Sequence, residues 1–270
     1  MTKQSRLPTF IASSLPVLLL ILIEGAIFLL QTETRFAPHF AIGVFAAQLI
    51  CLIVFIRGEI CPGQRGRLIR TNRYFAFYWL AILFINPLIN QTHIFTTLIS
   101  LFGLSALYLI NKHSKPYTAG RNLLIMSALI NGFGIFAYLI FMARLPTFVF
   151  VEFNPIAQLL AGILLANLAL TTARSRLQRF LALLPLTFVI TLACNALIVF
   201  IYLLVISLTQ TESAVDFDII FAYVLYFAAH LLAAAIIAFP LLRHDKLTYS
   251  PLLILFFIVA YLPLWGRVTG

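Results

Sequence analysis

Charged residues are scarce in this sequence, and acidic residues are the scarcest of all. Only 10% of the 270 residues are charged, and eight of these are Asp or Glu. Hydrophobic residues make up 63% of the chain, and the mean hydropathy is +1.06. Soluble domains are about half apolar and about a quarter charged. The composition therefore excludes an ordinary soluble domain.

Cysteine and histidine are also few, with three and five residues. The cysteines fall in predicted helices (Cys51, Cys194) and in a predicted cytoplasmic loop (Cys61), so we expect no disulfide framework. The histidines are scattered along the chain without the spacing of metal ligands or of paired haem ligands. They are His39, His93, His113, His230 and His244. No catalytic or nucleotide-binding motif stands out, and we expect neither a metal nor a cofactor.

Long apolar runs are what the sequence has instead. A helix needs about 20 apolar residues to cross a bilayer core. Continuous rather than alternating runs favour helices over a barrel, because a helix satisfies its own backbone hydrogen bonds in lipid. Nine runs are found, and they predict an all-α, polytopic membrane bundle of about nine transmembrane helices: 10–30, 40–56, 74–92, 94–110, 123–142, 156–171, 181–208, 219–240 and 249–266.

The basic residues give an independent test of this count, because cytoplasmic loops of membrane proteins are rich in Lys and Arg. With the N-terminus in the cytoplasm, the outer segments hold only Arg35, Arg144 and Arg267 of the 18 basic residues. All the others fall in inner segments. The sequence thus predicts a cytoplasmic N-terminus and an outside C-terminus.

The connections between these runs are too short for a soluble domain, so we expect residues 1–270 to form a single transmembrane domain. The formal net charge of +10 is explained by topology and by contact with anionic lipid headgroups, and no nucleic-acid partner is expected. Lys3 and Arg6 before the first run indicate a retained signal anchor. Short loops and a clear charge bias indicate a bacterial inner membrane.

Ionisable residues within predicted spans are functional-site hypotheses, because they are costly in lipid. Only Glu24 and His230 qualify. From the helical rise they lie roughly 9 Å and roughly 17 Å below the outer ends of their helices. Polar amides and one more histidine accompany them, at mid-depth (Asn131, Asn195) or toward the outer face (Gln158, Asn86, His93). We expect a polar interior that opens outward.

Each of these residues also has a structural interpretation. Glu24 is either a proton acceptor or cation ligand facing a cavity, or a structural carboxyl that is protonated or hydrogen-bonded. A neutral His230 bonded across helices is the simpler interpretation, as is structural bonding of the amides. Tyr223, Tyr226 and His230 share one helix face, and Ser127, Asn131, Gly134 and Tyr138 share another.

Arginines cluster in two predicted cytoplasmic loops, and we expect them to contact anionic lipid headgroups or an acidic partner. The positive-inside rule already accounts for their presence. These residues are Arg65, Arg67, Arg70, Arg73, Arg174, Arg176 and Arg179. Small residues four apart, such as Gly43/Ala47 and Gly162/Ala166, predict close helix packing.

Two Asn-Pro segments, "NPLINQ" from Asn86 and "FNPIAQ" around Asn154, resemble each other. Paired elements of this kind occur in the broken helices of transporters. The simpler interpretation is that Pro155 starts a helix and Pro87 kinks one near its end.

Three function classes fit these features. The first is transport or flipping of a small or lipid-like solute through the outward-opening polar interior. The second is a non-catalytic subunit or assembly factor of a membrane complex, with other subunits or a second copy as partners. The third is a membrane-embedded enzyme acting on lipid, which needs an acid/base pair and finds only Glu24 and His93 toward the outer face. We rank transport first and the enzyme last.

Overall fold

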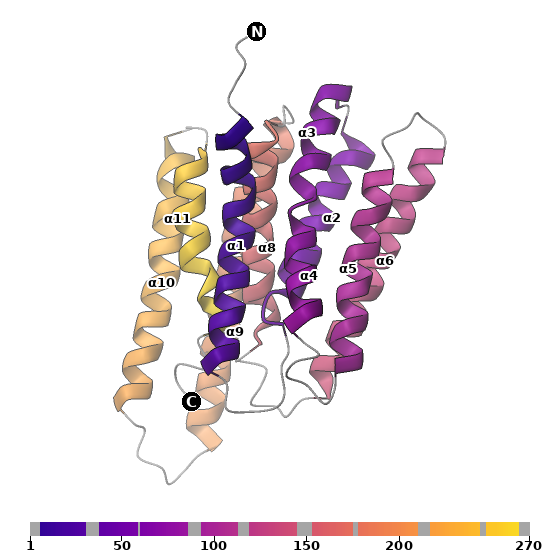
Figure 1. Ribbon diagram of the computed structural model, residues 1–270. Helices are drawn as coiled ribbons and strands as arrows, with labels where there is room; N and C mark the ends of the chain where they lie inside the picture. The colour runs from indigo at the N-terminus through magenta and orange to yellow at the C-terminus, as the bar shows by residue number, and fades with distance from the viewer. Residues whose placement is uncertain are drawn as a thin grey trace.

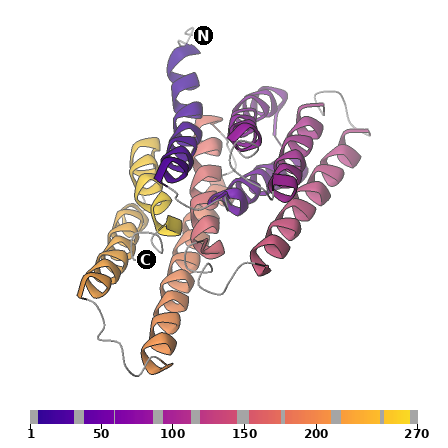
Figure 2. The same cartoon turned by 60° about the horizontal axis from the view of Figure 1, so that its bottom comes forward.

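The computed structural model describes residues 6–30, 38–58, 60–85, 93–112, 119–144, 153–174, 178–209, 217–243 and 247–264, and every regular element among them is helical. The helices lie roughly side by side as one bundle (Figure 1), and Figure 2 shows the same bundle with its lower end turned forward. They are α1 (Arg6–Leu30), α2 (Ala41–Arg57), α3 (Pro62–Asn72), α4 (Phe75–Ile85), α5 (His93–Lys112), α6 (Ala119–Ala143), α8 (Pro155–Thr172), α9 (Gln178–Thr209), α10 (Phe217–Leu242), α11 (Tyr249–Ala260) and the short 3-10 turn η2 (Leu262–Leu264).

The predicted all-α membrane bundle is confirmed. Each of the nine predicted runs contains a helix, and six of these helices are long and apolar enough to cross a bilayer. The other three are shorter: α2, α4, and α11 with η2. Part of the run that contains α4 and the turn after it lie outside the described residues.

One helix was not predicted. Residues 62–72 were expected to belong to a cytoplasmic loop, but they form α3, with Pro62 at its first turn. The buried side chains of α3 fall on one face, which includes Gln64, Leu68 and Asn72. Four-residue spacing puts such positions on a single side of a helix. Hydropathy does not detect α3 because arginines occupy its opposite face.

Helix α8 is the central element. Of its membrane-spanning window 72% is buried, against 22% for α9 and for α10. It crosses α2 where two glycines meet: a Cβ on Gly162 would lie 2.3 Å from the Gly43 carbonyl oxygen, and a Cβ on Gly43 would lie 2.5 Å from the Gln158 carbonyl oxygen. Small residues let membrane helices approach this closely, as the spacing predicted.

A hydrogen bond connects α1 and α11 beside a proline of α1. Pro16 lies inside α1 and has no N–H to donate to the carbonyl of Ala12, four residues earlier. The Tyr249 hydroxyl of α11 donates a hydrogen bond of 2.9 Å to that carbonyl instead. The backbone group that Pro16 leaves open is thus satisfied by a distant helix, as burial in lipid requires.

The described basic residues collect at one end of the bundle, except Arg144, which follows α6 at the other end. In Figure 1 the start of α1, all of α3 and the last turns of α2, α5, α8 and α10 lie at the upper end. These segments and the start of α6 carry Arg57, Arg65, Arg67, Arg70, Arg73, Lys112, Arg121, Arg174 and Arg243. This is the separation that the charge pattern predicted, and the opposite end, where α2 and α8 begin, is the predicted outer end.

Candidate functional site

Glu24 is fully buried in α1, and its carboxyl group lies at the N-terminus of α2. One oxygen, Oε1, accepts hydrogen bonds from the Tyr78 hydroxyl (2.9 Å) and from the backbone N–H of Phe40 (3.1 Å). The other, Oε2, lies 3.2 Å from Nδ1 of His39. A carboxylate is favoured there because the first N–H groups of a helix have no intrahelical acceptor and carry a partial positive charge.

His39 joins this carboxyl group to the start of α8. Its side chain is fully buried, and its ring stacks on Phe153 with the ring centroids 4.5 Å apart. Nε2, the nitrogen that does not face Glu24, has no hydrogen-bond partner among the described residues. The contact between Nδ1 and Glu24 therefore joins two fully buried ionisable side chains.

Hydrogen bonds of Gln158 and Tyr138 connect the starts of α2 and α8. The Gln158 side chain accepts from the Ile42 N–H (3.1 Å) and donates to the Phe153 carbonyl (2.7 Å) and to the Tyr138 hydroxyl (3.0 Å). Tyr138 in turn donates to the Pro38 carbonyl at 2.7 Å. Neither helix can shift at this end without breaking these bonds.

A separate amide network surrounds the N-terminus of α8. The Asn154 side chain accepts from the N–H groups of Ile156 (3.0 Å) and Ala157 (3.1 Å), the usual bonds of a helix cap, and Pro155 starts the helix. Its amide nitrogen donates to Asn195 Oδ1 of α9 at 2.7 Å. This is the simpler of the two interpretations that the Asn-Pro pattern allowed for Pro155.

Asn195 carries this network on to α10. Its amide nitrogen lies 2.8 Å from the Tyr226 hydroxyl and 2.9 Å from His230 Nε2. His230 Nδ1 lies 2.9 Å from the Tyr226 carbonyl, which can only accept. His230 therefore donates through Nδ1 and accepts through Nε2, which is the bonding of a neutral imidazole. The arrangement fits the structural interpretation of His230.

The structure thus brings some predicted residues together and separates others. Glu24 and Gln158 lie in the network of bonds around the starts of α2 and α8, which we call the first network. Asn195 and His230 lie in the amide network that begins at Asn154, which we call the second network. Asn131 is in neither network: it donates to the Ser127 carbonyl of its own helix at 2.8 Å. Asn86 and the side chain of His93 lie outside the described residues.

Sequence reasoning missed three members of the first network. His39 was assigned to an outer connection, whereas the structure buries it directly before α2. Tyr78 and Tyr138 are also fully buried. Tyr138 was predicted to share a helix face with Ser127 and Asn131, which are likewise buried, but it was not assigned to the site. Tyr78 carries no sequence signal because it lies in an aromatic, apolar run.

Two of the predicted lipid-contacting arginines have bonds inside the protein. Arg67 Nε donates to the Ala173 carbonyl at the C-terminus of α8 (2.9 Å), and Arg73 Nε donates to Asn111 Oδ1 of α5 (3.1 Å). Arg67, Arg70, Arg73 and Arg174 are exposed, whereas Arg65 is half-buried. Arg176 and the side chain of Arg179 lie outside the described residues.

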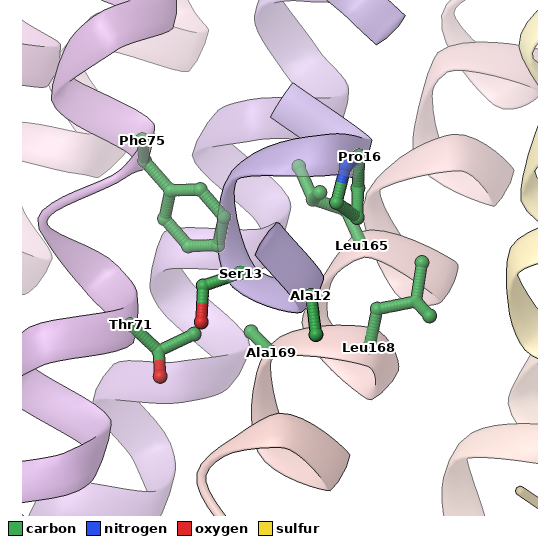
Figure 3. A pocket seen from close by; sticks show the side chains of 8 residues that line it. All are labelled: Ala12, Ser13, Pro16, Thr71, Phe75, Leu165, Leu168 and Ala169. Carbon is green, nitrogen blue, oxygen red and sulfur yellow. The ribbon is translucent and has the colours of Figure 1, made fainter. Parts of the chain in front are cut away.

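A small hollow lies between α1, the junction of α3 and α4, and α8 (Figure 3). Its lining is apolar apart from two hydroxyl side chains, Ser13 and Thr71. The Thr71 hydroxyl donates to the Arg67 carbonyl of its own helix at 3.1 Å. No member of either polar network lines this hollow, so it is separate from the candidate site.

In the part of the chain that is described, no three His, Cys, Asp or Glu side chains gather as a metal site would require.

Comparison with known proteins places this architecture in a family. The family described as an integral membrane domain matches residues 3–268. A protein of Haemophilus influenzae, described as an uncharacterized protein, is 46% identical over 268 residues, which cover 98% of each chain. No solved structure matches the chain. With nearly its whole length matched, the chain belongs to this family of integral membrane domains.

Proposed function

We propose that this protein transports or flips a small or lipid-like solute across a bacterial inner membrane, and that Glu24 and His39 form its ionisable centre. The observation that supports this most is the buried Glu24 carboxyl group, which takes bonds from two other elements at the N-terminus of α2. Ionisable residues inside membrane proteins mark ion and substrate paths. Helices that begin within a transporter supply its binding groups in the same way.

Proton exchange at this centre would act on the position of α2. An ionised Glu24 can accept from the Phe40 N–H, Tyr78 and His39 together. A protonated Glu24 carries an O–H on one oxygen, so that oxygen becomes a donor and the bonding to the neighbouring donors has to change. The start of α2 therefore has different bonding in the two states, and this is the kind of two-state element that ion coupling requires.

The change would also reach α8. His39 stacks on Phe153, and the Phe153 carbonyl accepts from Gln158, which also holds the Ile42 N–H. These contacts lie at the ends where α2 and α8 begin, opposite the basic end of the bundle (Figure 1). This position supports a polar path that opens on the outer side.

The basic end supports a second part of the proposal, contact with anionic lipid headgroups. Arg67, Arg70 and Arg73 follow one another at three-residue spacing along the exposed side of α3. Lys and Arg close to a membrane surface each contribute about 1 kcal/mol to the attraction of anionic lipid.

The test is reconstitution of the purified protein in liposomes with two probes. Proton flux is followed with an internal pH-sensitive dye under an imposed membrane potential, and lipid flipping with a fluorescent phosphatidylethanolamine quenched from outside. We expect at least one flux above that of empty vesicles, and we expect Glu24→Gln to abolish it. Glu24→Gln keeps an acceptor for Phe40 and Tyr78 but removes the ionisable group.

Tyr226→Phe is the matched control, because it removes one buried hydroxyl from the second network and leaves Glu24 untouched. It should retain the flux. Equal flux in the wild-type and Glu24→Gln proteins, or no flux of either probe with correctly folded protein, would contradict the transport proposal.

A specific observation favours a second candidate, a non-catalytic subunit or assembly factor. Both Glu24 oxygens are engaged within the protein, as expected of a group that only holds helices together. In that case Glu24→Gln lowers the unfolding temperature or the recovery of a partner chain, and the wild-type protein produces neither flux.

A further inference from the structure

Three buried polar side chains in the middle of the bundle carry polar atoms that have no hydrogen-bond partner among the described residues. Gln48 of α2 is fully buried, and neither its oxygen nor its nitrogen has a partner among the described residues. The same holds for Trp79 Nε1 of α4 and for Asn131 Oδ1 of α6. A buried polar group without a partner destabilises the folded protein. Four such atoms indicate that something polar meets them.

Contacts between α2 and α6 place two of these side chains at one level. The two helices run in opposite directions, and their contacts descend in step from the outer end. Tyr138 bonds to Pro38 there, and one to two turns deeper a Cβ on Gly134 would lie 2.3 Å from the Phe45 ring. Since Phe45 is opposite Gly134, a three-residue step along each helix places Gln48 opposite Asn131.

Contacts of α5 bring Trp79 to the same level. The Ser127 hydroxyl donates to the Ala106 carbonyl, which sets the register of α5 against α6. Gly103, three residues before Ala106, then lies beside residues 130–131. A Cβ on Gly103 would lie 2.4 Å from Trp79 Nε1, and the Trp79 ring also packs on Phe45 with centroids 4.4 Å apart. We call Gln48, Trp79 and Asn131 the mid-bundle polar layer.

The chemistry of this layer selects its ligand. The Gln48 amide nitrogen and the Trp79 N–H donate, while the Gln48 and Asn131 carbonyl oxygens accept. The buried carboxyl group of Glu24 bonds to Tyr78, Phe40 and His39 and not to this layer. A neutral molecule that donates and accepts fits this set, and water needs two to four such partners to be held inside a protein.

We propose that the mid-bundle polar layer binds water, and that this water forms the inner part of a proton path whose outer part is the Glu24–His39 pair. The water site is independent of the proposed function, whereas its use as a proton path rests on it. Gln48 lies about 12 Å along α2 from Phe40, from the helical rise. Toward the basic end Asn72 continues the line: it is 1% exposed, and both its side-chain polar atoms lack described partners.

Tryptophan fluorescence tests the water site. Trp79 and Trp265 are the two tryptophans of the chain, so the variant Trp265→Phe leaves Trp79 as the only indole. A hydrogen-bonded, hydrated indole emits at longer wavelength than a dry one, and its emission rises in D2O. We expect a D2O response from Trp79 although its side chain is fully buried.

Substitutions in the layer should remove that response. Gln48→Met and Asn131→Leu should shift Trp79 emission to shorter wavelength and reduce the D2O effect. Asn167→Leu, at a buried amide of α8 outside the layer, should change neither. If the variants do not fold, the D2O response of the Trp265→Phe protein alone still decides. Absence of that response, or an equal response in Gln48→Met, overturns the water site.

The proton path has its own readout. In the liposome assay with the pH-sensitive dye, Gln48→Met should reduce proton flux to that of empty vesicles, while Asn167→Leu should not. Normal proton flux in Gln48→Met overturns the path even if the layer is hydrated. A Glu24→Gln protein with normal flux instead overturns the proposed function and leaves the fluorescence result unaffected.

Discussion

Helix α2 begins without a capping side chain of its own, whereas α8 begins with Asn154, which caps its own helix. The first N–H groups near the start of α2 bond to Glu24 of α1 and to Gln158 of α8. One start therefore depends on an ionisable group from a distant segment, and the other on a neutral neighbour in sequence. Of the two capping side chains, that of α2 is ionisable and that of α8 is not.

The largest expected effect comes from removing each cap. Glu24→Leu leaves the Phe40 N–H and the Tyr78 hydroxyl without an acceptor, at about 1–3 kcal/mol for each buried group. Asn154→Leu should cost less, about 0.5–2 kcal/mol for the lost helix cap. Unfolding of both variants in detergent, followed by circular dichroism, measures the difference. An equal loss in the two would remove the distinction between the two starts.

The next effect concerns the crossing that joins the two helices. Gly162→Ala places a Cβ 2.3 Å from the Gly43 carbonyl oxygen and forces α2 and α8 apart. Overpacking of this kind costs about 1–3 kcal/mol or more. Gly132→Ala is the control, because a Cβ on Gly132 meets nothing within 4 Å. Thermal unfolding should separate the two, and unchanged stability of Gly162→Ala would show that the crossing is looser than described.

Two hydroxyl deletions sharpen the comparison further. Tyr78→Phe removes a bond to the carboxyl group of Glu24, for which about 1.5–3 kcal/mol is expected if that group is charged. Tyr226→Phe removes a bond between neutral groups, at about 0.5–1.5 kcal/mol. A double-mutant cycle of Tyr78→Phe with Glu24→Leu, which removes the acceptor, gives the coupling energy of the pair. A coupling near zero would mean that Tyr78 and Glu24 act independently.

The smallest effect is expected at the other end of α8. Arg67→Gln removes the bond from Arg67 Nε to the Ala173 carbonyl and should cost about 0.5–1.5 kcal/mol. For Arg70→Gln, at an exposed arginine of the same helix, we expect little change in stability. Both should weaken binding to vesicles that contain phosphatidylglycerol. Equal stability of the two variants would show that the Arg67 bond does not stabilise α8.

The bundle could be predicted because its causes are local and repetitive. Continuous apolar runs specify helices in lipid, and the sorting of Lys and Arg specifies which end of each run is cytoplasmic. Helix α3 escaped prediction because its arginines lower its hydropathy, although its buried positions recur every four residues. Its burial depends on the helices around it, which no local average contains.

The candidate site could be predicted only in part. Glu24 stood out because a carboxyl group in an apolar run is rare. Its partners did not, because His39 lies in a connection and Tyr78 lies in the aromatic run "FAFYW". Their contacts with Glu24 span 15 and 54 residues of sequence. A pairing set by tertiary packing leaves no periodic signal in a single chain.

The bond from Tyr249 to Ala12 has a consequence for biogenesis. A membrane chain is inserted from its N-terminus onward. Helix α1 therefore enters the bilayer while the Ala12 carbonyl has no hydrogen-bond donor, because Pro16 has no N–H. This carbonyl receives its hydrogen bond only when Tyr249 of α11 arrives, 237 residues later. Insertion of α11 thus completes the bonding of α1, and a protein truncated before Tyr249 would leave that carbonyl without its hydrogen bond in lipid.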